Sequence, residues 1–200
     1  MVTLFANLHS QEIANQYSIK LNPNLSNQWW STYNSYGIAP SKIELAYRLE
    51  KQNKKIKYNF LIYGSKNRIY IGESFFSYKL PNNNFIKLGR YYRDFSSYLN
   101  DNLSSGSMLI SNNAEPLPKV GFLGSYNIKK NKNFNLNFGI AHGFFKKNQL
   151  YKSAPMLHEK FIYLNYSKEN KEWGIGLVHE AMWAGSTEKY GDFPSSFNDF

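Results

Sequence analysis

Residues 133–144 alternate in character more regularly than any other segment and restrict what this chain can fold into. Alternate positions starting from Asn133 hold Asn, Asn, Asn, Gly, Ala and Gly, and the positions between them hold Phe, Leu, Phe, Ile, His and Phe. Because successive side chains of a β-strand point to opposite faces, this pattern predicts a strand with one wide apolar face. The other face is polar or very small, which suits a crowded or water-filled barrel interior better than a soluble sandwich.

Shorter runs with the same period occur along most of the chain. In residues 43–51, for example, Ile43, Leu45, Tyr47 and Leu49 alternate with mostly charged residues. Strands are predicted for residues 43–51, 55–63, 68–79, 85–93, 133–144, 160–168 and 172–184, with a phase slip typical of a bulge at 72–74. The sequence therefore predicts an all-β fold in which an antiparallel meander forms part of a β-barrel.

Non-periodic segments complete the expected organisation. Residues 1–40 are a lead-in segment, and residues 94–119 are a long loop that lies outside the barrel or folds into its lumen. We expect residues 1–200 to form one domain and to be a fragment of a longer protein, because the chain stops at Phe200 on an aromatic residue. The first residues lack the basic and apolar regions of a secretory signal peptide, so export is not readable from them.

Hydropathy decides between the two membrane architectures. Mean hydropathy is −0.54 and there are no cysteines, and no apolar run approaches the roughly 20 residues of a membrane-spanning helix. A transmembrane β-barrel remains open, because only every second residue of its strands faces lipid.

Two tryptophans fit the dimensions of such a barrel. Trp173 and Trp183 lie on the same face of one predicted strand. Ten residues of a strand tilted by about 40 to 45° span roughly 23 to 25 Å, the height of the apolar band between two aromatic girdles. An ordinary long strand with two buried tryptophans is the competing interpretation.

Motifs for catalysis or cofactor binding are incomplete. The segment His179-Glu180-Ala181-Met182-Trp183 starts like a zinc-protease motif, but tryptophan replaces its second histidine and the context is a strand. The glycine-containing segment at 174–176 has no third glycine and no helix after it. Paired carboxylates for glycoside hydrolysis and a serine partner for His142 cannot be identified. We expect no enzymatic activity, no cofactor and no metal.

The charge balance points to an anionic partner. Lys and Arg number 24 against 14 Asp and Glu, a formal net charge of +10. A nucleic acid is one candidate, because segments such as 90–93 mix basic and aromatic residues. The cations are spread over strands and turns rather than gathered in one stripe, and an acidic polysaccharide or lipopolysaccharide would be bound by the same physics.

Several segments, in the same order, resemble the Wzi-type capsule-assembly family of Gram-negative outer-membrane β-barrels. The most specific is Gly106-Ser107-Met108-Leu109-Ile110-Ser111-Asn112-Asn113-Ala114, followed by Glu115-Pro116-Leu117-Pro118-Lys119. The supporting segments are Asn27-Gln28-Trp29-Trp30, Tyr36-Gly37-Ile38-Ala39-Pro40, Leu88-Gly89-Arg90, Leu157-His158-Glu159-Lys160, Leu177-Val178-His179-Glu180-Ala181-Met182-Trp183-Ala184-Gly185 and Gly191-Asp192-Phe193-Pro194.

The resemblance implies a closed barrel of about 18 strands in the complete protein, of which this chain would hold roughly half. It also implies a non-catalytic, lectin-like protein that attaches capsular or other exported polysaccharide at the cell surface. The expected partners are an acidic glycan, outer-membrane lipid and lipopolysaccharide, with no nucleic acid. A general porin or transport barrel is the alternative function, and a soluble basic nucleic-acid-binding β protein is the third.

No binding residues of the family map by motif onto this chain, so candidates come from alternation alone. The side chains placed opposite the apolar set that suit an acidic glycan are Arg48, Lys57, Lys87, Tyr91 and Arg93. The phase of residues 85–93 is ambiguous. The competing interpretation is that Arg48 fills the lumen and pairs with Glu44 or Glu50 on adjacent strands.

Overall fold

The computed structural model describes residues 2–9, 13–21, 41–66, 68–92, 114–128 and 133–196, with side chains described from residue 13 onward. Its elements are antiparallel β-strands and one short 3-10 turn. This confirms the all-β class and the antiparallel meander. No described residue belongs to a helix long and apolar enough to cross a membrane.

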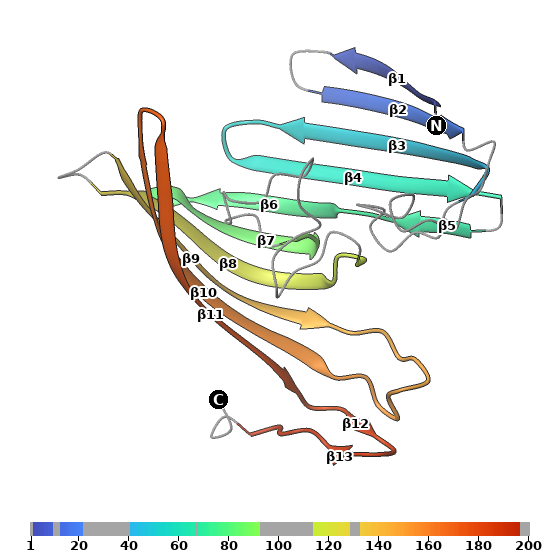
Figure 1. Ribbon diagram of the computed structural model, residues 1–200, viewed down its shortest axis with the longest axis vertical. Helices are drawn as coiled ribbons and strands as arrows, with labels where there is room; N and C mark the ends of the chain where they lie inside the picture. Colours follow the sequence, from blue (N-terminus) through green and yellow to red (C-terminus); the bar gives the residue numbers. More distant parts are fainter. Residues whose placement is uncertain are drawn as a thin grey trace. The chain divides into compact units, whose positions relative to one another are not determined.

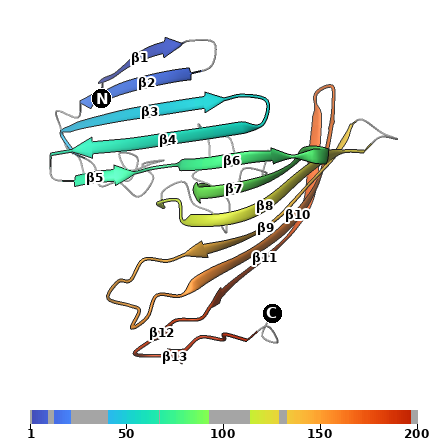
Figure 2. The same cartoon turned by 180° about the vertical axis from the view of Figure 1, so that it is seen from behind.

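The strands follow one another along the sheet nearly in chain order (Figures 1 and 2). They are β1 (Val2–His9), β2 (Ile13–Leu21), β3 (Ile43–Gln52), β4 (Ile56–Ser65), β5 (Arg68–Ile71), β6 (Ser74–Leu80), β7 (Asn84–Arg90), β8 (Pro118–Asn127), β9 (Phe134–Phe144), β10 (Met156–Lys168), β11 (Lys171–Trp183), β12 (Ser186–Thr187) and β13 (Gly191–Asp192), with the 3-10 turn η2 at Pro81–Asn83. Strand β5 pairs with β4 off the main path, and β12 and β13 form a separate two-stranded sheet.

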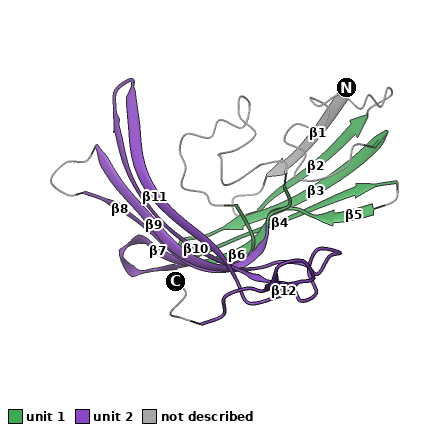
Figure 3. Ribbon diagram, turned by 60° about the horizontal axis from the view of Figure 1, so that its bottom comes forward, with its two compact units in different colours: residues 1–77, 90–116 green, residues 78–89, 117–200 purple. Residues whose placement is uncertain are grey.

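The chain divides into two compact units, coloured separately in Figure 3. Unit 1 comprises residues 1–77 and 90–116, and unit 2 comprises residues 78–89 and 117–200. The division falls within β6 and β7, and each unit is described by itself below.

In unit 1 the face of β3 that carries the apolar side chains is the more exposed one. Leu45 is 52% exposed on β3, whereas Leu61, on the opposite face of β4, is 5% exposed. The predicted strands at 43–51 and 55–63 pair as a hairpin, with Tyr47 opposite Ile62. The Tyr47 ring also contacts that of Tyr17 on β2, with the centroids 5.0 Å apart and the planes tilted by 35°. The exposed face contains an apolar hollow of about 360 Å³ lined mainly by Tyr17, Ile19, Leu45, Tyr47, Ile62 and Ile69.

In unit 2 the exposed face likewise follows the alternation of residues 133–144. On β9, Ala141 is 1% exposed, while its neighbour Ile140 is 41% exposed. The register places Ile140 beside Phe122 of β8 and Lys160 of β10. We call the face that carries Ile140 the apolar face and the face that carries Ala141 the polar face. The exposed face of β8–β11 thus carries most of the large apolar side chains, while Lys119 and Glu159 are buried on the other face together with Leu123 and Phe161. A water-soluble sheet buries its apolar face instead.

Small residues on the polar face are covered by larger neighbours. A Cβ atom added at Gly139 would lie 2.5 Å from Cζ of Phe161 and 2.7 Å from Cδ2 of Leu123. At Gly176 the added atom would lie 2.1 Å from Cδ1 of Tyr163. The crowding expected from the glycines and alanine of residues 133–144 is therefore present.

This crowding gives the first prediction. Replacing Gly139 by valine should lower the free energy of unfolding by about 1 to 3 kcal/mol, because Phe161 and Leu123 must move. Replacing Gly64 by valine is the matched control, since an added Cβ there meets nothing within 4 Å, and the strand preference of valine should leave that variant equal or slightly more stable. Urea unfolding followed by circular dichroism measures both, and equal effects would contradict the packing argument.

Most predicted strands are present within a few residues of their expected bounds, but three segments differ. Strands β1 and β2 lie in the segment described as a lead-in, and β8 was not predicted. The run at 68–79, expected to bulge, instead breaks into β5 and β6. At the break the amide of Gly72 donates to the carbonyl of Leu61 at 2.8 Å, and an added Cβ on Gly72 would lie 2.9 Å from the ring of Tyr63.

Candidate functional site

The polar face of unit 2 contains a buried ion pair. Nζ of Lys119 on β8 lies 3.4 Å from Oε2 of Glu159 on β10, and the two side chains are only 6% and 4% exposed. Burying two charges is costly, and mutual attraction offsets that cost only when the partners are well placed. The pair therefore places a demanding polar contact within unit 2.

The strand between the two partners explains how they meet. Lys119 lies opposite Gly143 of β9, and Glu159 lies opposite Ala141 of the same strand. A Cβ atom added at Gly143 would lie 3.1 Å from Cγ of Lys119, so the lysine stem passes over the glycine. Small residues on β9 thus leave room for Lys119 to reach across a whole strand.

A second carboxylate stands beside the pair. The register of β10 and β11 places Glu180 directly opposite Glu159, and Glu180 is half-buried. Side chains directly opposite on antiparallel strands are close neighbours, and like charges there repel. Lys119 therefore reduces the repulsion between two facing carboxylates.

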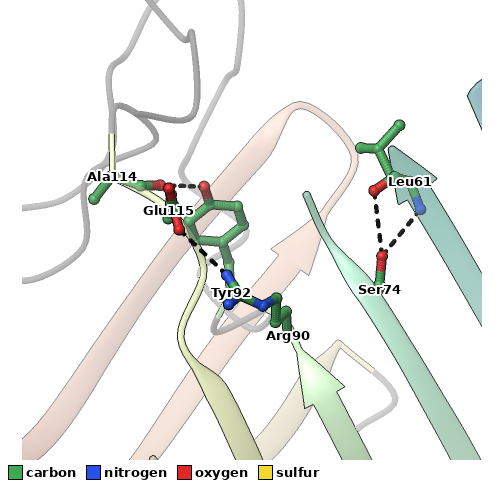
Figure 4. A network of polar contacts seen from close by, with 6 residues as sticks. All are labelled: Leu61, Ser74, Arg90, Tyr92, Ala114 and Glu115. Atoms are coloured by element: carbon green, nitrogen blue, oxygen red, sulfur yellow. Dashed lines mark hydrogen bonds and ion pairs between the residues drawn. The ribbon is translucent and has the colours of Figure 1, made fainter. Parts of the chain in front are cut away.

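Unit 1 holds a polar network around the end of β7, shown in Figure 4. Nη1 of Arg90 lies 3.3 Å from Oε2 of Glu115, and the hydroxyl of Tyr92 donates to the carbonyl of Ala114. The side chain of Ser74 accepts from the amide of Leu61 at 3.0 Å. The contacts of Arg90 and Tyr92 fasten the segments on both sides of residues 93–113 to each other, whereas that of Ser74 joins β6 to β4.

The segments that carry the family resemblance supply the partners in both clusters. Arg90 ends the Leu-Gly-Arg segment and contacts Glu115 of the longest segment. In unit 2, Lys119 at the end of that longest segment contacts Glu159. Sequence reasoning did not select Lys119 or Glu159 for the site, although both occur within the segments that it singled out.

The predicted glycan-binding residues are distributed between the two units. Arg48 is half-buried and Lys57 is close enough to Glu50 for an ion pair, with 3.0 Å between Nζ and Oε1. Lys87 of unit 2 is 4% exposed, and Tyr91 of unit 1 is 2% exposed with its ring edge-on to that of Phe75. Arg93 lies outside the described residues. Arg48 and Lys57 share one face of β3 and β4, and glycan binding by any of the five stays a prediction.

On the apolar face of unit 2, side chains that lie opposite one another on β9, β10 and β11 form rows across the strands. The predicted girdle residues Trp173 and Trp183 lie in two of these rows. Trp173 lies opposite Tyr166, which lies opposite Phe134, so three rings form a row across β9, β10 and β11. The Trp173 and Tyr166 rings stack at 5.4 Å. Trp183 lies in a second row with Met156 and Phe144.

Between these rows the apolar face carries a group of basic and histidine side chains. We call it the basic patch, and it consists of His142, His158, Lys160 and His179. Ring centroids are 4.7 Å apart for His142 and His158, and 6.0 Å apart for His158 and His179. Within the described ranges no group of three or more His, Asp or Glu side chains is placed to hold a metal ion. The alternation of residues 133–144 placed His142 on an apolar face, but it did not group the four residues.

Comparisons with known proteins provide no relative for this chain: no family model, no curated protein and no solved structure matches it significantly.

Proposed function

We propose that this chain is part of an outer-membrane β-barrel of a Gram-negative bacterium that binds an acidic surface polysaccharide without catalysis. The observation that carries the proposal is the exposure of the apolar face of unit 2. Leu177 is 74% exposed on the apolar face, whereas Glu159 is 3% exposed on the polar face. Contiguous exposed apolar surface of this kind marks a membrane or protein interface, because water-soluble monomers rarely tolerate it.

Strand length supports lipid as the partner of the apolar face. A tilted strand crosses the apolar layer of a membrane with about 9 to 11 residues. Strand β9 has 11 residues, and β10 and β11 have 13 each. The two rows that contain Trp173 and Trp183 have the spacing of two aromatic girdles, as proposed from the sequence.

The net charge and the Wzi-type resemblance favour an acidic polysaccharide as the ligand. The formal charge is +10, which attracts polyanions over distances of about 8 Å at physiological salt. Among the described members of the predicted set, Arg48 and Lys57 are the accessible ones, because the Lys57 side chain is 43% exposed and Arg48 is half-buried. We propose that they make first contact with the glycan.

Replacing Arg48 and Lys57 together by glutamate should weaken polysaccharide binding at least about tenfold, the effect of losing roughly 1.4 kcal/mol. The matched control is Lys54 to glutamate, which reverses an exposed charge in the neighbouring turn. The assay uses detergent-purified protein and the surface polysaccharide of the producing cell, after cell fractionation. Equal binding by the double variant and the control would contradict the assignment of these residues.

Fractionation tests the broader proposal. Outer-membrane location with saturable glycan binding supports it. Outer-membrane location with ion conductance and no binding would replace it by a transport barrel, and a monomer that is soluble without detergent would overturn it.

A further inference from the structure

Charge is sorted between the two faces of β8, β9, β10 and β11, which are described throughout. The carboxylates of these strands are Glu159, Glu172 and Glu180, and alternation places all three on the polar face. The apolar face carries the basic patch together with Lys168 and Lys171, and no carboxylate. Such a face has groups to attract an anion and none to repel it.

The basic patch is compact and partly accessible. The register places Lys160 between Ile140 and His179, and His158 between His142 and Ala181. His142, Lys160 and His179 are exposed, and His158 is buried among them. Val120, opposite His142 on β8, adds no charge. Three adjacent strands therefore bring one lysine and three imidazoles together in two neighbouring rows.

The position of the basic patch between apolar residues identifies the kind of anion. His142 and His158 lie two residues from the row of Trp183, and Lys160 and His179 lie four residues from it. Along a tilted strand these steps correspond to about 5 and 10 Å. Long basic side chains on an apolar surface extend toward the polar boundary. An anion attached to an apolar body would satisfy both the basic patch and the surrounding surface.

We propose that the basic patch binds the head group of an anionic lipid whose acyl chains lie along the apolar face. This inference rests on the proposed function, because it takes the apolar face to contact lipid. The lysine supplies a positive charge, and the exposed imidazoles of His142 and His179 supply N–H donors for the phosphate oxygens. Ile162 and Leu177, exposed on the neighbouring row, offer the surface for the acyl chains.

The test uses the full chain folded in neutral maltoside micelles, with phosphatidylglycerol and phosphatidylcholine as probes and native mass spectrometry as the readout. We expect phosphatidylglycerol to be retained about fivefold more than phosphatidylcholine, the effect of roughly one basic side chain near a lipid surface. Replacing Lys160 and His179 together by glutamine should abolish this preference. Lys160 to arginine, and Lys147 to glutamine in the exposed connection after β9, should retain it.

Each outcome decides one question. Equal retention of both lipids by the folded parent protein, or an unchanged preference in the double variant, overturns the lipid site and leaves the proposed function standing. Loss of phosphatidylglycerol to an excess of inorganic phosphate also overturns it, because the site would then take a free anion. A chain that does not fold in micelles and is monomeric in water overturns the proposed function and the lipid site together.

Discussion

Replacing Leu177 by arginine should lower the free energy of unfolding from a bilayer by about 2 kcal/mol, the lower end of the cost of a basic residue at the lipid-facing midplane of a β-barrel, because Lys160 already places a charge on the neighbouring row. Leu177 is 74% exposed and lies six residues from Trp183 and four from Trp173 on the same strand. In the proposed orientation that exposed surface contacts acyl chains. An arginine there must be desolvated or must pull water into the apolar layer.

In water the same substitution should change the free energy of unfolding very little. A side chain this exposed makes few contacts, and surface substitutions of this kind change stability by at most about 0.5 kcal/mol. A large loss of stability would therefore depend on the solvent that surrounds Leu177 rather than on packing within unit 2. This makes the substitution a direct test of what covers the apolar face.

Tyr190 provides the matched control. It is 73% exposed but lies in the turn between β12 and β13, outside the apolar face. Its replacement by arginine should cost less than about 0.5 kcal/mol. The measurement is equilibrium unfolding in urea from phospholipid vesicles, with tryptophan fluorescence as the signal. Similar small effects at Leu177 and Tyr190 would contradict a lipid-facing β11.

Strands were predictable from the sequence where their two faces differ strongly in polarity and side-chain size. Strand β9 was predicted almost to the residue because its apolar and small residues alternate without interruption. Strand β8 was missed because Leu123 lies on the polar face and Gly124 on the apolar one. The structure explains the exception at Gly124, where an added Cβ would lie 2.3 Å from Cζ of Phe138. A neighbouring ring fills the place of the missing side chain.

Strand β2 was missed for a related reason. Its apolar face starts with Ile13 and Asn15, and the contrast between faces becomes clear only from Tyr17 onward. Asn15 is accommodated because it accepts a hydrogen bond from the hydroxyl of Tyr47 at 2.9 Å. Pairing with β3 decides that this segment is a strand, and such a pairing is not visible in the segment itself.

The candidate site was harder to predict because it depends on the register between paired strands. Lys119 and Glu159 are 40 residues apart in the chain, and they meet only because two strand pairings place Gly143 and Ala141 between them. Alternation assigns each residue to a face but says nothing about which residues of that face are neighbours. The five residues chosen by alternation therefore include two that the structure buries, Lys87 and Tyr91.

Replacing Lys119 by methionine should lower the free energy of unfolding by about 3 to 5 kcal/mol, since Glu159 keeps a buried charge without its lysine. Glu180, directly opposite, adds a second carboxylate to the same place. Replacing Lys119 by methionine and Glu159 by leucine together should recover much of the loss, because the double variant buries no charge at either position. Urea unfolding of these two variants and of the single Glu159 to leucine variant completes a double-mutant cycle.

The ion pair of Lys20 and Glu44 is the matched control for this prediction, because its atoms are equally close but its side chains are less buried. Its nitrogen and oxygen are also 3.4 Å apart, but the two side chains are 26% and 16% exposed. Replacing Lys20 by methionine should cost at most about 1 kcal/mol, the usual value of an ion pair near the surface. If the two lysine substitutions lower the free energy of unfolding equally, the shared distance rather than burial sets the energy of these ion pairs. The polar face of unit 2 would then have to be as well hydrated as an exposed sheet. A clear difference would mean that Lys119 and Glu159 fix the alignment of three strands in an interior that excludes water.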